Sequence, residues 1–428
     1  DLHSFPTRRS SDLQLDTKIG KLITDIRKSL VENGRELSDE EVRETIENRV
    51  LNEKWLLNEN FEVIEKISDS VFYSIRRDLS ILQPYMEDDT VSEIMVNGLS
   101  NVFIEQNGII RETDCKFFSI GELEEVIRRI AAKVHREINE MCPIVDARLE
   151  DGSRVNGVYR NIALNGPILT IRKFPQNRIT MKTLIDNQTI SEEAAEFLEK
   201  IVSSGYNIFI SGGTSSGKTT FLNALADFIP KKERIIVIED SAELQIEGIS
   251  NIVRLECKNS NSQGGGEISM ADLIKTSLRM RPDRIIIGEV RDGTAFLQML
   301  QAMNTGHDGS LSTGHGNSVE GMLRRLESLY LQETNFPLEA IQAQIGQGID
   351  LMVHLGRLRD GSRKVLEICE LLGSKNGDFI INPIFTYNIS EGLSAVGDGL
   401  KKKEKLLIME RVHGTGENNH KKKRSKKK

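Results

Sequence analysis

A run of glycines and small hydroxyl residues ends in a lysine and two threonines between residues 212 and 220 of this 428-residue chain. A glycine, four residues and then Gly217-Lys218-Thr219 form the pattern of a phosphate-binding P-loop. An apolar stretch (207–210) precedes the run, and a segment of helical character (221–225) follows it. Strand, loop and helix thus stand in the order that a nucleoside triphosphate site requires. The residues of the loop are Gly212, Gly213, Thr214, Ser215, Ser216, Gly217, Lys218, Thr219 and Thr220.

Each residue type in this loop has a chemical reason to be there. Glycines permit backbone conformations that aim successive N–H groups inward, and the following helix adds the positive end of its dipole. Lys218 is placed to reach the β- and γ-phosphates, and the hydroxyl of Thr219 to bind Mg²⁺. The loop therefore predicts ATP and Mg²⁺ as cofactors.

Carboxylates end two strongly apolar stretches beyond the P-loop. Residues 234–240 run into Glu239 and Asp240, and residues 282–289 end in Glu289. Runs that are apolar at nearly every position are typical of parallel strands covered on both faces, and ligands bind at the carboxyl ends of such strands. We expect Glu289 to orient the attacking water, and Glu239 and Asp240 to share the Mg²⁺ and water network. Which acid is the base stays open. The expected Mg²⁺ ligands, partly through water, are Thr219, Glu239 and Glu289.

Two histidines, each preceded by Thr-Gly, follow the Glu289 stretch: His307 and His315. A lone histidine is more often structural than catalytic. The repetition within nine positions favours a phosphate-sensing role for both, and we take them as candidate site residues.

Three arginines precede the P-loop segment, on stretches that read as short strands: Arg148, Arg154 and Arg172. One interpretation is solvated charge on a strand face. The other is that they point at the phosphates of a bound nucleotide, as an arginine finger does. We carry them as candidate catalytic residues.

The elements that must position these residues have an α/β pattern, with a helical lead-in whose first cap is Ser38 and its following acids. The first thirteen residues lack a starting Met and resemble a translated sequencing adapter, so we leave them out of the fold prediction. The predicted divisions are an adapter segment (1–13), a helical lead-in (14–82), an α/β N-terminal domain (83–174), a linker or hinge (175–184), a P-loop domain (185–390) and a disordered basic tail (391–428).

Composition limits the partners. The net charge of −7 argues against a dedicated nucleic-acid binder. Seven of the last eight residues are basic, which suits either a solvated tail or attraction to anionic lipid or nucleic acid. Four cysteines lie far apart, which indicates reduced thiols in a cytosolic protein. No stretch approaches the ~18 apolar residues of a membrane span. Any membrane role is therefore expected to be peripheral.

Four motifs in one order resemble the type II/type IV secretion ATPase superfamily (GspE/VirB11-like). The P-loop corresponds to its Walker A motif, residues 238–243 to its Asp box, residues 281–291 to its Walker B motif, and Thr313-Gly314-His315 to its His box. Residues 91–98 and 151–156 are similar to the CpaF-type branch, which powers assembly of Tad (Flp) pili. The basic tail is not part of the family pattern.

The resemblance implies a RecA-like ATPase domain joined by a hinge to the N-terminal domain. It also implies a homohexameric, Mg²⁺-dependent ATPase that acts with an inner-membrane platform protein, is cytoplasmic, lies against the inner face of the cell membrane and takes no specific nucleic acid. Two alternatives stay open: a sister motor for type IV secretion or pilus retraction, and a RecA-like nucleic-acid translocase. The sequence does not identify the secreted substrate.

Overall fold

The computed structural model describes residues 10–32, 37–57, 59–174, 178–258 and 266–409. The chain divides into two compact units, Asp1–Asn177 and Arg178–Lys428, which are treated separately below. The expected mixed α/β fold, with a smaller α/β unit before a P-loop unit, is confirmed.

The chain begins with a small helical bundle. Ser38 accepts a hydrogen bond from the backbone N–H of Glu41, and Glu41 reaches back to the N–H of Ser38, so the predicted cap is a complete capping box. The helices bury a common apolar stripe that includes Ile26, Ile46 and Val71. The elements of the bundle are α1 (Ser10–Glu32), α2 (Asp39–Leu51), the short 3-10 helix η1 (Lys54–Leu56) and α3 (Phe61–Arg76).

The predicted adapter segment and the predicted tail lie partly outside the described residues. Residues 1–9 of the adapter segment lie outside the described residues, whereas residues 10–13 belong to α1. At the other end, residues 410–428 lie outside them, and this range contains the whole lysine-rich run.

An antiparallel sheet of six strands forms the rest of the N-terminal unit, in the order β3-β2-β1-β6-β5-β4. Helix α5 packs its apolar stripe, which includes Leu123 and Ile127, against the sheet residues Ile94 and Ile171. The elements are η2 (Ser80–Leu82), α4 (Gln83–Glu87), β1 (Val91–Asn97), β2 (Val102–Gln106), β3 (Ile109–Glu112), α5 (Ile120–Lys133), β4 (Ile144–Arg148), β5 (Arg154–Val158) and β6 (Ile168–Arg172).

The C-terminal unit is built on a nine-stranded sheet in the order β15-β14-β13-β12-β7-β11-β10-β8-β9. The six strands from β12 to β9 in this order pair in parallel, and β12 to β15 pair as an antiparallel meander. The strands are β7 (Ile208–Gly212), β8 (Ile235–Glu239), β9 (Ile252–Glu256), β10 (Arg284–Ile287), β11 (Leu311–His315), β12 (Leu351–Arg357), β13 (Arg363–Lys375), β14 (Asp378–Asn388) and β15 (Gly392–Ala395).

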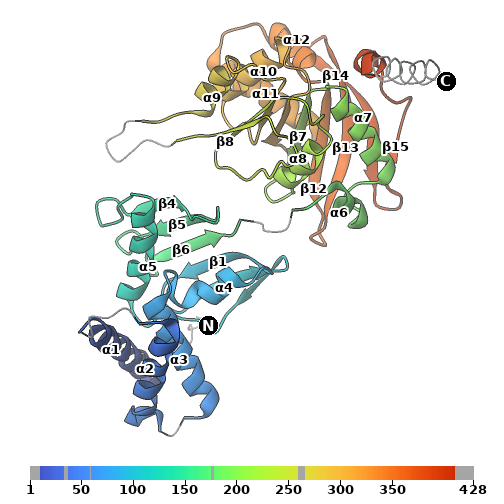
Figure 1. The fold of residues 1–428 in the computed structure, drawn as a ribbon. Coiled ribbons are helices and arrows are strands. Elements are labelled where there is room, and N and C mark those ends of the chain that lie inside the picture. Colours follow the sequence, from blue (N-terminus) through green and yellow to red (C-terminus); the bar gives the residue numbers. More distant parts are fainter. Residues whose placement is uncertain (1–9, 33–36, 58, 175–177, 259–265, 410–428) are drawn as a thin grey trace, which may run out of the picture. The chain divides into compact units, whose positions relative to one another are not determined.

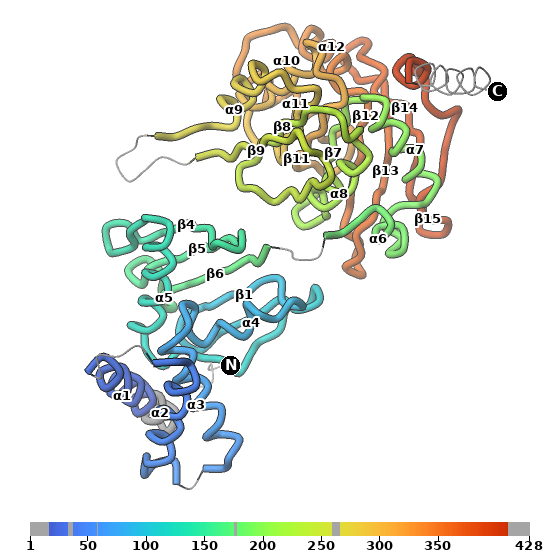
Figure 2. The backbone as a smooth tube through the Cα atoms, viewed as in Figure 1, coloured from blue at the N-terminus to red at the C-terminus, as the bar shows by residue number. Residues whose placement is uncertain are grey.

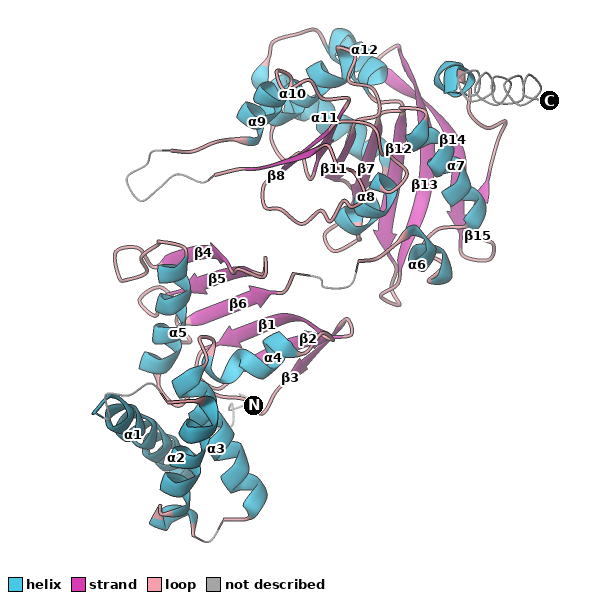
Figure 3. Ribbon diagram, viewed as in Figure 1, coloured by secondary structure: helices cyan, strands magenta, loops and turns pink. Residues whose placement is uncertain are grey.

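Helices cover both faces of this sheet, as the tube in Figure 2 and the ribbon in Figure 3 show. One core lies between the sheet and α7 and α8, the other between the sheet and α9 to α12. Strands β7, β8 and β10 are buried at every position, as their apolar sequences predict. The helices are α6 (Met181–Asp186), α7 (Glu192–Ser203), α8 (Lys218–Ala226), α9 (Met270–Ser277), α10 (Gly293–Asn304), α11 (Val319–Glu333) and α12 (Leu338–Gly348).

The predicted linker is shorter than expected. Residues 175–177 lie outside the described residues, but Arg178 already belongs to the C-terminal unit. Helix α6 begins at Met181, because the hydroxyl of Thr180 caps it by accepting the N–H of Thr183. The polar composition that suggested a hinge is therefore partly that of a helix cap.

The prediction of a disordered tail from residue 391 is wrong for its first part. Residues 392–395 form β15, and Leu400 is buried in the core. The reason is Glu370 on β13, which is only 1% exposed. Its two carboxylate oxygens accept the backbone N–H groups of Lys401 and Lys402, at 2.8 and 2.6 Å. This contact, which we call the Glu370 clasp, fixes the segment against the sheet.

Candidate functional site

The P-loop lies at the carboxyl edge of the parallel sheet, directly after β7. Ser215 (φ 57°) and Gly217 (φ 93°) adopt left-handed conformations that fold the loop back on itself. A Cβ atom on Gly212 would lie 2.6 Å from the carbonyl oxygen of Leu355, so only glycine fits there. No described side chain caps α8 at Gly217, which leaves its first N–H groups pointing to the loop. This is the geometry of an anion site.

Lys218 is 7% exposed and lies beneath the loop. Its Nζ donates to the carbonyl oxygens of Gly212 (3.2 Å) and Gly213 (3.0 Å). Burial lowers the pKa of Lys218, and the nearby charge of Glu289 opposes that shift. A buried ammonium whose partners are neutral groups has a strong electrostatic reason to accept a phosphate.

A chain of polar contacts runs from Lys218 across the sheet edge. Lys218 Nζ lies 3.4 Å from Nδ1 of His315, and the other ring nitrogen of His315 lies 2.6 Å from Oε1 of Glu289. Arg291 then bridges Glu289 Oε2 (2.8 Å) and Asp240 Oδ2 (2.9 Å). The structure thus brings together the predicted residues Lys218, His315, Glu289 and Asp240.

His315 acts in this chain as a neutral ring. Its pKa is lowered, first by burial and then by the charge of Lys218. With Nδ1 toward an ammonium and Nε2 toward a carboxylate, the favoured tautomer carries its proton on Nε2. His315 therefore links the P-loop lysine to Glu289 and is placed to respond to a phosphate between them.

Glu239 is not free to act as expected. It is 3% exposed, and its Oε1 accepts the N–H groups of Glu243 (2.8 Å) and Leu244 (2.9 Å). Burial raises the pKa of Glu239, while those two N–H groups partly oppose the shift. The carboxylate holds the turn after β8, so we replace its predicted metal and catalytic roles with a structural one.

The position of His307 does not fit the phosphate-sensing role predicted for it. Leu311 pairs with Ile208 at the start of β11 and β7, and both strands run toward the P-loop edge. His307 precedes Leu311, so it lies at the amino edge, opposite the P-loop. Its Nδ1 contacts the carbonyl oxygen of Ala302, and its own carbonyl accepts the hydroxyl of Ser310. The first Thr-Gly-His copy, which ends at His307, therefore belongs to the turn after α10.

The three arginines form one row in the N-terminal unit. Arg148 pairs with Arg154, and Arg154 pairs with Arg172, across β4, β5 and β6. Register partners project from the same face of a sheet. The row is thus real, and it belongs to a different unit from the P-loop.

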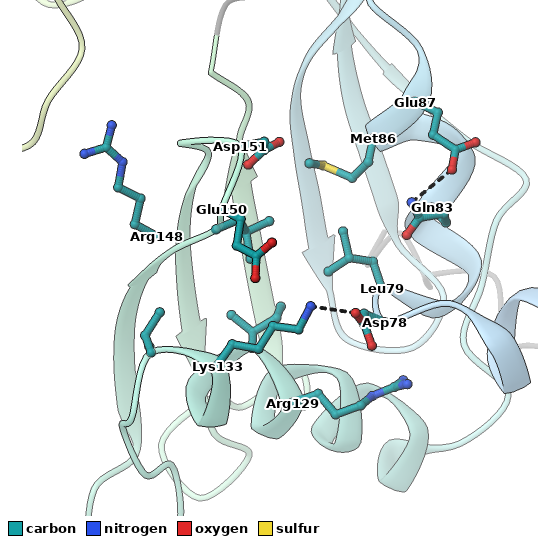
Figure 4. Close-up of a pocket in the computed structure, with 13 residues that line it drawn as sticks. Asp78, Leu79, Gln83, Met86, Glu87, Arg129, Lys133, Arg148, Glu150 and Asp151 are labelled. Carbon is teal, nitrogen blue, oxygen red and sulfur yellow. Dashed lines mark hydrogen bonds and ion pairs between the residues drawn. The ribbon is translucent and has the colours of Figure 1, made fainter.

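Arg148 also lies at the edge of a cavity of about 320 Å³ in the N-terminal unit. Figure 4 shows Lys133 and Asp78 paired across it, at 2.6 Å, while the guanidinium of Arg148 extends away from this pair. Acids such as Glu150 and Asp151 line the cavity beside the cations. This mixture of charges does not make a phosphate site.

A larger cavity of about 660 Å³ opens at the P-loop, between Gly213 and Thr214 on one side and α11 on the other. It reveals residues that the sequence analysis did not assign: Arg291, Asn317 and Arg325. Arg291 and Asn317 each stand two residues after a predicted site residue, a spacing that could have indicated them. Outside this cavity, Arg363 from β13 donates to the carbonyl oxygen of Ser215 at 3.0 Å.

Two of the three predicted ligands, Thr219 and Glu289, lie where they suit a Mg²⁺ ion at the P-loop. Oε1 of Glu289 is a buried oxygen that lies 2.6 Å from Nε2 of His315, without a hydrogen bond of good geometry between them. A carboxylate beside the P-loop suits a water held by a cation, and the hydroxyl of Thr219 stands at the first turn of α8. No group of three or more His, Cys, Asp or Glu residues in the described chain forms a ready metal cage.

Two buried histidines lead to a prediction about stability and pH. The pKa values of His315 and His354 both lie below the ordinary 6.5, chiefly because of burial. As pH falls through 6.5, the unfolded chain binds these protons first, so the free energy of unfolding should fall. Calorimetry at about pH 8 and about pH 6 should show a lower melting temperature at the lower pH. A His354→Gln variant should show a smaller drop, and an equal drop would contradict this origin.

Comparison with known proteins gives three findings. Residues 76–369 match the family model described as type II/IV secretion system protein. An uncharacterized protein of Methanocaldococcus jannaschii is 42% identical over 250 residues, which are 56% of this chain and 34% of that protein. This chain therefore spans about a third of that relative. The conjugal transfer protein TrbB of Rhizobium radiobacter is 35% identical over 300 residues, covering 69% of this chain and 88% of TrbB.

Among solved structures, the crystal structure of the pilus retraction motor PilT with bound ADP superimposes with a TM-score of 0.53. The match is 20% identical and covers 79% of this chain and 88% of that one. At this identity the likeness shows a shared fold.

Proposed function

This chain belongs to the type II/IV secretion system protein family, and from that premise we propose that it is a Mg²⁺-dependent, ATP-hydrolysing motor that powers assembly of a Tad-type pilus or related secretion. The observation that carries the proposal is the contact chain from Lys218 through His315 to Glu289 at the P-loop. It joins a phosphate-binding cation to a carboxylate placed to act on water. A protein that only bound nucleotide would have no need for the second half of this chain.

The proposed reaction divides among a few residues. The P-loop N–H groups hold the polyphosphate, and Lys218 exchanges its loop carbonyls for phosphate oxygens. Glu289 orients the attacking water with its carboxylate, which His315 and Arg291 hold in place. Mg²⁺, when bound through Thr219 and water on Glu289, neutralises phosphate charge. His315 contacts Lys218 and Glu289 at once, and so reports the γ-phosphate to the carboxylate.

Arg291 has a role in this scheme that the sequence did not suggest. It holds Glu289 and Asp240 in one place through two contacts of 2.8 and 2.9 Å. Glu289 and Asp240 are the two predicted acids that do not hold the turn after β8. Arg291 therefore keeps their two charges together before nucleotide binds. Asp240 then shares the water network through Arg291.

The arginine row supports a closed, ring-dependent site. Arg148, Arg154 and Arg172 lie in adjacent register on one face of the sheet, and Glu93 on β1 pairs with Arg172 at the end of the row. We propose that the N-terminal unit closes over the nucleotide so that Arg148, Arg154 and Arg172 stabilise charge in the transition state. A homohexameric ring would hold this closed form, and an inner-membrane platform protein would receive the motion.

Turnover per subunit should therefore rise with protein concentration as rings form. ATPase activity across a dilution series, with sedimentation to report mass, tests this. Arg172→Ala should lower kcat more than it weakens ATP binding, because its contribution is made mainly in the closed state. Arg128→Ala, which removes an exposed arginine outside the row, is the matched control. Full specific activity in a monomer would rule out the ring mechanism and leave the P-loop assignment standing.

Residues 91–98 and 151–156 support the Tad-type branch, and the TrbB match supports a sister motor of a conjugal or type IV secretion system. Stimulation of ATPase activity by DNA would favour the alternatives, including a nucleic-acid translocase. Stimulation by a pilus platform protein would favour the Tad assignment. None of the helices in the described chain is both long and apolar enough to cross a membrane. We propose a cytoplasmic protein held at the membrane by its platform partner, where the lysine-rich tail would contact anionic lipid.

A further inference from the structure

His354 is a buried, polar residue beside the P-loop strand that the mechanism above does not use. It lies on β12, is 6% exposed, and pairs in register with Ser211 on β7. On the other side of β7, Ser211 pairs with Gly314 of β11. His354 and Ser211 thus stand in the sheet row just before Gly212 and His315.

The imidazole hydrogen-bonds Ser211 and has a second polar neighbour in the backbone of Asn317. Its Nδ1 lies 2.9 Å from the hydroxyl of Ser211, which is fully buried. Burial lowers the pKa of His354, although the charge of Glu367 opposes this. A neutral ring accepts the Ser211 proton on one nitrogen and donates from the other.

Those two segments are the strand that leads into the P-loop and the loop that follows His315. Ser211 immediately precedes the P-loop, and Asn317 follows His315 by two residues and lines the P-loop cavity. Beyond the ladder of β7 and β11, which ends at Gly212 and His315, the backbone contact is Gly316 N–H to Gly212 O, which is long, at 3.3 Å. His354 supplements that contact from the neighbouring strand.

Packing alone does not explain a histidine here. The sheet face around it is a core of residues such as Phe209 and Met352, where an apolar side chain would fill the space. Burying an imidazole among them is unfavourable unless both nitrogens are satisfied. The polar ring is present at this position because of its two partners.

We propose that His354 is a positioning residue for ATP hydrolysis, which holds the P-loop strand and the loop after His315 in the arrangement that places His315 against Lys218 and Glu289. This inference rests on the proposed ATPase function. It assigns no contact with ATP to His354, so its effect should fall on turnover and on the setting of His315, with little effect on nucleotide binding.

The test compares substitutions by kcat, KM and the imidazole NMR shifts of His315. His354→Leu should lower kcat about tenfold, the scale of one lost hydrogen bond, and change KM for ATP by less than about threefold. His354→Gln, whose amide both donates and accepts, should recover most of the activity. Ser211→Ala combined with His354→Leu should cost less than the two single changes together, because they remove one shared contact.

Gln342→Leu is the control for general destabilisation. Gln342 is also fully buried and bridges Glu327 and the carbonyl of Gly377, in α12 and away from the P-loop. It should lower the melting temperature comparably and leave kcat unchanged. At one fixed alkaline pH, His354→Leu should shift the His315 imidazole signals, and Gln342→Leu should not.

The NMR shifts of His315 distinguish failure of the proposed ATPase function from failure of the positioning role of His354. If wild-type protein binds ATP but never turns it over, the proposed function fails, and a shifted His315 signal in His354→Leu still supports the positioning role. Unchanged His315 signals, or equal loss of kcat in His354→Leu and His354→Gln with a fully folded protein, would overturn it. A rise in KM without a fall in kcat would also overturn it, since that would make His354 a support of binding alone.

Discussion

Purified Lys218→Ala protein should show no measurable ATP turnover and should bind ATP at least about tenfold more weakly, since each 1.4 kcal/mol lost is a factor of ten. The side chain is a buried cation that donates hydrogen bonds to the carbonyls of Gly212 and Gly213, with His315 beside it. Its loss removes the cation that is buried beneath the loop, where the β- and γ-phosphates would bind. Nucleotide affinity by calorimetry and turnover by phosphate release are the measurements.

The matched control for that change is Lys231→Ala. Lys231 is an exposed lysine of the same unit, and its Nζ contacts the carbonyl of Glu247 away from the P-loop. It should keep wild-type affinity and turnover. Because Lys218 satisfies two loop carbonyls, the melting temperature of Lys218→Ala should be recorded as well. Wild-type turnover in folded Lys218→Ala protein would refute the assignment of this loop.

Glu289→Gln should bind ATP but hydrolyse it on the order of 10²-fold more slowly or worse, the scale of lost acid–base or electrostatic assistance. Binding rests on the P-loop, which Glu289 does not touch, whereas orientation of water rests on its carboxylate. Glutamine preserves the shape of the side chain and still accepts a hydrogen bond from Arg291. Single-turnover hydrolysis alongside equilibrium binding separates the two effects.

Glu256→Gln is the control for Glu289. This change removes a carboxylate from the carboxyl end of β9. Strand β9 lies beside β8, on the side away from β10 and Glu289. Turnover of the Glu256→Gln variant should stay near the wild-type value. Loss of ATP binding by folded Glu289→Gln protein would instead make Glu289 a binding or structural residue, and the water-orienting role would pass to Asp240.

The parts of the fold that follow local rules were predictable. Strands β7, β8 and β10 are apolar at almost every position, and that pattern specifies parallel strands covered on both faces. The P-loop has a fixed spacing, so Lys218 and Thr219 were assigned before any geometry. The acids at the ends of β8 and β10 followed from the rule that ligands bind at carboxyl ends of parallel strands.

The remaining site residues depend on pairings that the sequence does not carry. His307 and His315 share the same Thr-Gly context, and only the register of β11 against β7 places one at each edge of the sheet. Glu239 and Asp240 are adjacent in sequence, but Glu239 ends β8 and is buried beneath a turn, whereas Asp240 lies just past the strand, beside Arg291. His354 is 143 residues from Ser211 along the chain, so no local motif predicts that contact.

The Glu370 clasp sets where the chain can be shortened or fused to another protein. A cut before Lys401 would remove the two N–H donors and leave a carboxylate buried with only Asn382 beside it. Leaving a buried acceptor without its partners costs about 1–3 kcal/mol, and more for a charged group. Leu400 would leave the core in the same step. A C-terminal truncation or fusion junction should therefore lie after the clasp, so that Leu400, Lys401 and Lys402 keep their contacts.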